Sequence, residues 1–212
     1  MNRSYIKTIY KPTSTNPVFL QSISNSDQCS LIVRNFLFNY FNFKKFAEFY
    51  SPYFPDYIIA KRDGLCSQLK YEFFVNNLTQ PNIILLVGNI QPPRKNSYAN
   101  YEIFTTIFNY IKNLGCKTYM SFGTITINHS VSTIYISATS KKLVTKVIKK
   151  FGGKIFKWGT IDGAIGLIIG LAHFHNLDGL CILQPLADKE SLEIAALRLF
   201  KYLVSILEST KE

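Results

Sequence analysis

The sequence has few of the residues from which catalytic and metal sites are built. It has three histidines, and His173 and His175 are two positions apart rather than at the i, i+4 spacing of a helical metal pair. The four cysteines form no C-x-x-C pair, which excludes a zinc knuckle or a redox motif and favours ordinary core thiols in a reducing compartment. Outside the C-terminal helix the acidic residues are dispersed. We therefore predict no catalytic, cofactor-binding or metal-binding residues and no cofactor.

Long hydrophobic runs are also absent. The most apolar segment, Ala164 to Ala172, is nine residues long, whereas a membrane-spanning helix needs about 20. The first twenty residues mix Arg3, Lys7 and Lys11 with prolines and show no secretory signal. We expect a cytoplasmic protein with no membrane partner. With 47% hydrophobic residues and no linker or repeat, we predict one domain over 1–212, with about 1–16 and 208–212 mobile.

Arginine is scarce, although the formal net charge is +11. A basic surface can attract nucleic acid, but arginine is the side chain suited to bidentate phosphate contacts. Seven lysines form an acid-free run over 141–157, interrupted by apolar residues at helical spacing. This pattern is typical of an amphipathic helix with a solvated lysine face. A nucleic-acid binder acting through the 141–157 run is therefore a third hypothesis, and we do not expect nucleic acid as the main partner.

Glycine is concentrated in one segment. Four of the eleven glycines lie within 159–170, at intervals of four, three and four, which is a helical period. Such a stripe would let a neighbouring backbone approach closely. The other explanation is an anion site at the start of the helix, with Gly159 and Thr160 as candidates. For Asp162, at the opening of the helix, we expect a structural role favoured by the helix dipole. The motifs of a phosphate loop and of a dinucleotide-binding turn are both missing.

Strand and helix patterns alternate along the chain. We predict a strand at 18–23, a helix over 31–41, and short strands at 43–50, 57–61 and 68–75. Asp63-Gly64 is a hairpin signal, so we expect a small antiparallel element near residues 43–75. Later elements are expected at 83–87, 103–114, 118–122, 133–137, 141–151, 159–172, 179–183 and 189–207. This order predicts an α/β fold with a mostly parallel central sheet.

The late part of the chain resembles a known family. Gly159-Thr-Ile-Asp-Gly163-Ala-Ile-Gly166-Leu-Ile-Ile-Gly170-Leu-Ala172, followed by Leu177-Asp-Gly179-Leu-Cys-Ile-Leu183, is similar to the late signature of the proteasome assembly chaperone family, second-subunit type, in its archaeal members. The order of elements is similar over about 18–207. The resemblance implies a three-layer α/β/α sandwich of phosphorylase/hydrolase-like type and small homo-oligomers. It also implies chaperoning of proteasome-type subunits or another protein client.

Two departures from the family pattern indicate a divergent member. The glycine-rich turn after the first strand is replaced by Ser22-Ile-Ser-Asn-Ser-Asp-Gln-Cys-Ser30, and the final residues, Ser209-Thr-Lys-Glu212, lack the hydrophobic-Tyr-any tripeptide with which some relatives dock on the proteasome ring. Our leading hypothesis is a non-enzymatic assembly chaperone or scaffold. The alternative is a small-molecule or nucleotide-binding enzyme, matching the ATP-grasp-like label given to some members, with an anion site at the start of the Gly159–Gly170 helix.

Overall fold

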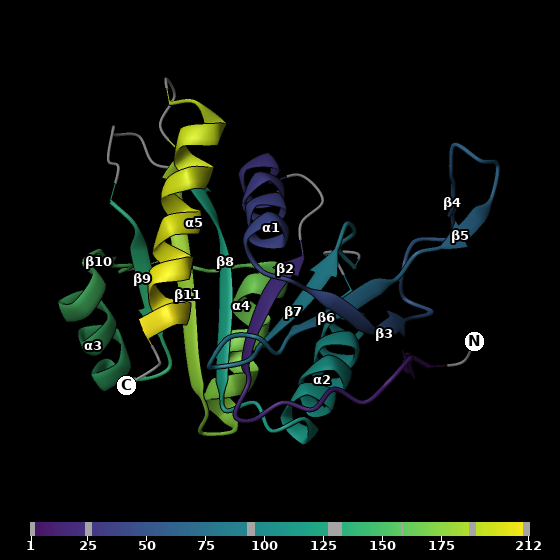
Figure 1. The fold of residues 1–212 in the computed structure, drawn as a ribbon, viewed down its shortest axis with the longest axis horizontal. Helices are drawn as coiled ribbons and strands as arrows, with labels where there is room; N and C mark the ends of the chain where they lie inside the picture. The colour runs from purple at the N-terminus through teal and green to yellow at the C-terminus, as the bar shows by residue number, and fades with distance from the viewer. Residues whose placement is uncertain are drawn as a thin grey trace.

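A large sheet runs through the whole molecule. The computed structural model describes residues 3–23, 27–92, 96–126, 133–157, 159–186 and 190–209. Nine strands pair in the order β1-β3-β6-β7-β2-β8-β11-β9-β10 (Figure 1). They are β1 (Tyr5–Thr8), β2 (Val18–Ile23), β3 (Lys44–Tyr50), β6 (Tyr71–Asn76), β7 (Ile83–Gly88), β8 (Thr118–Thr126), β9 (Tyr135–Ala138), β10 (Lys154–Ile155) and β11 (Asp178–Leu186). Strand β1 lies within the 1–16 region for which the sequence suggested mobility.

Parallel pairing is confined to the centre of the sheet and to the β9–β10 pair. Strands β7, β2, β8 and β11 run parallel to one another, and β9 is parallel to β10. Strands β1, β3, β6 and β7 pair antiparallel in that order, and β9 is antiparallel to β11. The sheet as a whole is therefore mixed. The apolar run that begins at Ile83 fits the place of β7 in the middle of the sheet: Ile83, Ile84, Leu85 and Leu86 are all buried, as expected of a strand covered on both faces.

Helices cover both faces of this central region. Helices α1 (Gln28–Tyr40), α3 (Lys141–Phe151) and α5 (Leu192–Ser209) contribute to one apolar core, and α2 (Ser97–Asn113) and α4 (Gly163–Phe174) to the other (Figure 1). The α3 helix follows its prediction closely. The Ser140 Oγ accepts a hydrogen bond from the Leu143 N–H at 3.2 Å, and Gly152 ends the helix. The α2 helix begins six residues before the predicted start. The prediction missed its first turns because Tyr98 and Tyr101 there are exposed, so the apolar residues show no helical period.

The block near residues 43–75 divides into two parts. Strands β3 and β6 join the large sheet, while β4 (Ile58–Ala60) and β5 (Cys66–Gln68) form the small antiparallel sheet around Asp63-Gly64. Figure 1 shows β4 and β5 extending away from the body of the molecule, at the end opposite α3. We call residues 57–68 the arm. The same view shows β3 and β6 without a described helix in front of them.

Candidate interaction surfaces

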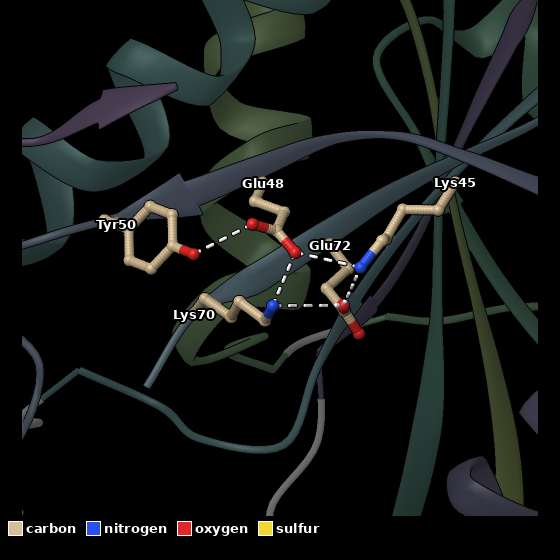
Figure 2. Close-up of polar contacts among 5 residues, drawn as sticks. All are labelled: Lys45, Glu48, Tyr50, Lys70 and Glu72. Carbon is tan, nitrogen blue, oxygen red and sulfur yellow. Dashed lines mark hydrogen bonds and ion pairs between the residues drawn. The ribbon is translucent and has the colours of Figure 1, made fainter. Parts of the chain in front are cut away.

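A charged network covers the bare side of β3 and β6, which we call the open face. Side chains alternate along a strand, so Phe49 and Tyr71 point into the core beneath α2, whereas Glu48 and Glu72 point to the open face. Figure 2 shows how the network closes around Glu48. Its Oε1 accepts hydrogen bonds from the Lys45 Nζ at 2.9 Å and the Lys70 Nζ at 2.5 Å, and its Oε2 accepts one from the Tyr50 hydroxyl at 2.8 Å.

These contacts determine the protonation of Glu48. Burial alone would raise the pKa of this carboxyl, whose side chain is only 9% exposed. The hydrogen bonds from Lys70, Lys45 and Tyr50 outweigh burial and lower the pKa to about 2. Burial and the bond to Glu48 together raise the pKa of Tyr50 to about 12. A carboxylate with such a low pKa is a weak base at neutral pH, so the network is suited to joining β3 to β6 rather than to proton transfer.

The sequence reasoning did not find this network. Lys45 and Glu72 are 27 positions apart and Lys70 and Glu48 are 22 apart, and these residues meet only because β3 pairs with β6. Part of the signal exists in the sequence, because Lys70 and Glu72 are two positions apart and so share one face of a strand. Lys45 and Glu48 are three apart, and they share a face only because the register shifts between Lys45 and Ala47. The sequence does not predict which carboxylate is enclosed by lysines.

A strongly basic surface lies at the other end of the molecule. All seven lysines of the 141–157 run are exposed, whereas Val144 and Val147 lie on the buried side of α3. The predicted amphipathic helix with a solvated lysine face is confirmed. Lys154 belongs to β10, the last strand of the sheet, where a lysine also discourages further strands from pairing with the edge.

The glycine-rich segment does not form a continuous packing stripe. The helix begins at Gly163 rather than Gly159, because Asp162 is extended and Gly163 has a φ of +67°, so Gly159 and Thr160 lie before the first turn. The predicted start was wrong, and Asp162 makes no side-chain capping bond. A Cβ on Gly166 would lie 1.8 Å from the carbonyl oxygen of Ile161.

At Gly170 the close-packing prediction was also wrong, because a Cβ there would meet no atom within 4 Å. The glycines thus serve different purposes. Gly163 supplies a positive φ, and Gly166 allows the lead-in segment to fold back against the helix. On the opposite side of α4, Ala164, Ile168 and Ala172 are buried against the sheet.

Comparison with known proteins places this architecture in a family. A family model described as PAC2 matches residues 29–210. The chain belongs to the PAC2 family. A crystal structure of Pyrococcus furiosus PbaB, described as an archaeal proteasome activator, superposes with a TM-score of 0.86 at 20% identity and covers 98% of this chain and 90% of that one. Pyrococcus furiosus PbaA, described as an archaeal homologue of proteasome-assembly chaperone, gives 0.75 at 20% identity and covers 96% and 86%.

A curated relative extends the comparison in sequence. An uncharacterised protein of Methanocaldococcus jannaschii is 26% identical over 172 residues, which is 79% of this chain. The match spans 65% of the length of that relative. The resemblance seen in the glycine-rich segment is thus confirmed as membership of the PAC2 family, although the glycines themselves do not form the surface that their spacing suggested.

The histidines and cysteines considered in the sequence form no metal-binding cluster within the described residues of this PAC2 family member. His175 stacks on Phe108 at 4.8 Å between ring centroids, and His173 is exposed near the end of α4. Cys66 contradicts the prediction of four core thiols, because it lies exposed in the arm while the other three cysteines are buried. Across the described ranges no group of three or more His, Cys, Asp or Glu residues could hold a metal ion. No helix in those ranges is both long and apolar enough to cross a bilayer.

The altered turn after the first strand is described only in part. Residues 24–26 lie outside the described residues, as do the third histidine of the sequence, His129, and the final 210–212. Asp27 caps α1, since its Oδ1 accepts the Ser30 N–H at 3.0 Å. Its Oδ2 accepts the Thr124 N–H at 3.1 Å. This side chain therefore joins the start of α1 to strand β8.

Proposed function

We propose that the protein is a non-enzymatic assembly chaperone or scaffold that binds proteasome-type subunits or another protein client and forms small homo-oligomers. The observation that carries the proposal is the likeness to PbaB over 98% of this chain, together with membership of the PAC2 family. PbaB and PbaA are described as a proteasome activator and a homologue of an assembly chaperone. We propose the same kind of partner, a proteasome-type protein, for this chain.

The geometry of the surfaces supports contact with proteins. The arm exposes apolar side chains, and the open face presents an ion-pair network whose enclosed carboxylate is a weak base. Helices on both faces of the sheet support the finer fold type, a three-layer α/β/α sandwich of phosphorylase/hydrolase-like type. We also propose that the chain forms one domain, since one sheet includes strands from Tyr5 to Leu186. A cytoplasmic location remains part of the proposal and rests on the sequence alone.

Co-expression with proteasome α-subunits tests the proposal. We expect a complex that co-elutes in size-exclusion chromatography with light scattering at about 0.15 M salt, where exposed charges more than about 8 Å apart are largely screened. An unrelated protein of similar basic charge serves as the control for non-specific attraction. A chain that stays monomeric and ignores the α-subunits would contradict the proposal.

A ligand screen separates this proposal from an enzyme that binds nucleotides. A ligand present at 100 times its Kd stabilises the folded state by about 2.7 kcal/mol. We expect no nucleotide or phosphate ester to raise the unfolding temperature. A saturable shift with one of them would favour the enzyme instead.

A further inference from the structure

The arm exposes apolar side chains on both of its faces. Successive residues of a strand point to opposite faces, and Ile58 is 58% exposed while Ile59 is 45% exposed. Tyr57 and Leu65 are exposed as well. The β4–β5 ladder has only three residue pairs, and an isolated two-stranded hairpin is at best marginally stable in water. A second surface that covers the arm would therefore stabilise it.

The outer edge of β4 has backbone groups ready for another strand. The Lys61 N–H donates to the Leu65 carbonyl at 3.0 Å, which makes these two residues a hydrogen-bonded pair of the antiparallel ladder. Hydrogen-bonded pairs alternate with non-hydrogen-bonded pairs along such a ladder. The backbone N–H and C=O groups of Ile59, two residues before Lys61, therefore also point toward β5. The N–H and C=O groups of Ile58 and Ala60 consequently point away from β5, toward the free edge.

The charge of the arm favours a second copy of this chain as its partner. The chain carries a net charge of +11, so two copies repel each other over most of their surfaces. The arm with its flanking Asp56 is neutral, because Asp56 and Asp63 balance Lys61 and Arg62. The lysine-rich α3 lies at the opposite end of the molecule (Figure 1). Contact between two arms therefore keeps the two basic ends farthest apart.

One register of the two arms is self-complementary. If β4 pairs antiparallel with β4 of a second copy about Ile59, the two Ile59 residues form a non-hydrogen-bonded pair and Ile58 faces Ala60. In this register Ile58 and Ala60 form hydrogen-bonded pairs through the outward-pointing backbone groups of both copies. The antiparallel direction also brings Asp56, just before β4, toward the hairpin turn of the other copy, which contains Arg62.

We propose that two copies of the protein associate through the outer edges of their β4 strands, forming a continuous four-stranded antiparallel sheet centred on Ile59. This inference deepens the proposed homo-oligomer by naming the surface between copies, and does not depend on which client is bound. The paired segment is short compared with the roughly 800 Å² that each partner buries in a standard interface. The dimer should therefore form reversibly and depend on protein concentration.

Disulfide trapping tests the register directly. In a Cys66→Ser background, Ile59→Cys brings two thiols together, because the Cα atoms of a non-hydrogen-bonded pair lie about 4.5 Å apart, within disulfide range. The matched control is Ser67→Cys, which pairs with Ile59 inside the arm. The two Ser67 positions would be three strand spacings apart, roughly 14 Å. We expect most of the Ile59→Cys chains to run as covalent dimers under mild oxidation, and few of the Ser67→Cys chains.

Proline variants test the edge by a second measurement. Ala60→Pro removes an N–H that points to the β4 edge, whereas Cys66→Pro removes one at the β5 edge of the same residue pair. Sedimentation velocity over a concentration series should show dimer for the wild type and Cys66→Pro and monomer for Ala60→Pro. Equal trapping of both cysteine variants, or equal behaviour of both proline variants, overturns the arm pairing. A wild-type monomer overturns both this inference and the proposed homo-oligomer, whereas a dimer that traps at Ile59 but ignores proteasome subunits overturns only the client.

Discussion

Replacing Glu48 by Gln should destabilise the protein in a pH-dependent way. The change keeps the size of the side chain and removes its charge, so of the two ion pairs of Lys70 only the 3.6 Å contact with Glu72 is left. The pKa change of Glu48 from 4.5 to about 2 corresponds to about 3 kcal/mol, at about 1.4 kcal/mol for each pKa unit. Water screens part of this, because the side chains of Lys45 and Lys70 are 36% and 27% exposed. We therefore expect a loss of about 1.5 kcal/mol at pH 7.

The dependence on pH identifies the carboxylate as the cause. Because folding lowers the pKa of Glu48, its contribution to the free energy of unfolding is complete above the unfolded pKa of 4.5. It is lost as the pH falls from about 5 to about 2. The wild type should thus be more stable than Glu48→Gln at pH 7 by about 1.5 kcal/mol, and this advantage should shrink steadily below pH 5.

Urea denaturation at a series of pH values measures both effects. At pH 7 the midpoint should fall with an unchanged m-value, and the melting temperature should fall by about 3–6 °C for a chain of this size. Glu72→Gln is the matched control, because Glu72 is more exposed and has no hydrogen bond from Tyr50, and we expect it to cost less than half as much. If Glu48→Gln equals the wild type at pH 7, or differs from it equally at pH 7 and pH 3, the reasoning is refuted.

Three further changes test the packing and the thiols. Gly166→Ala should cost about 2 kcal/mol, because its Cβ would collide with a backbone oxygen, whereas Gly170→Ala should stabilise by about 0.5–1 kcal/mol; chemical denaturation compares them, and equal effects contradict the assignment. Tyr71→Phe should lose about 1 kcal/mol, since the Ile90 carbonyl loses a buried hydrogen bond of 3.0 Å; an unchanged denaturation midpoint would exclude this. In the native protein Cys66 alone should react quickly with a thiol reagent, as counted by mass spectrometry, because the other three cysteines are buried.

Local signals in the sequence predicted the elements whose boundaries are set by nearby residues. Ser140 and Gly152 bound α3, and lysines and valines alternate between them at helical spacing, so both the helix and its solvated face could be predicted. The apolar run from Ile83 predicted a strand buried on both sides for the same reason. In these segments propensity, pattern and capping agree, which is the condition under which sequence reasoning is dependable.

Contacts between distant segments could not be predicted in this way. The enclosure of Glu48 depends on the register between β3 and β6, which turn chemistry and burial decide together. The glycine spacing at 159–170 suggested that all four glycines serve one packing surface. Gly163 is needed for its positive φ, and Gly166 because a Cβ there would clash with Ile161. Neither reason applies to Gly170. A helical period shows which residues share a face. It does not show whether anything lies against that face.

The distribution of charge distinguishes the two ends of the molecule. Five lysines of α3 lie on its exposed face, so this end attracts acidic surfaces and repels other copies of the chain. The arm is neutral and apolar, and the Glu48 network between the two ends balances two lysines with two glutamates. Pairing through the arms would leave both lysine faces outermost. A dimer of this kind could therefore hold two acidic client surfaces at once, because its own contact uses none of the charges that would bind them.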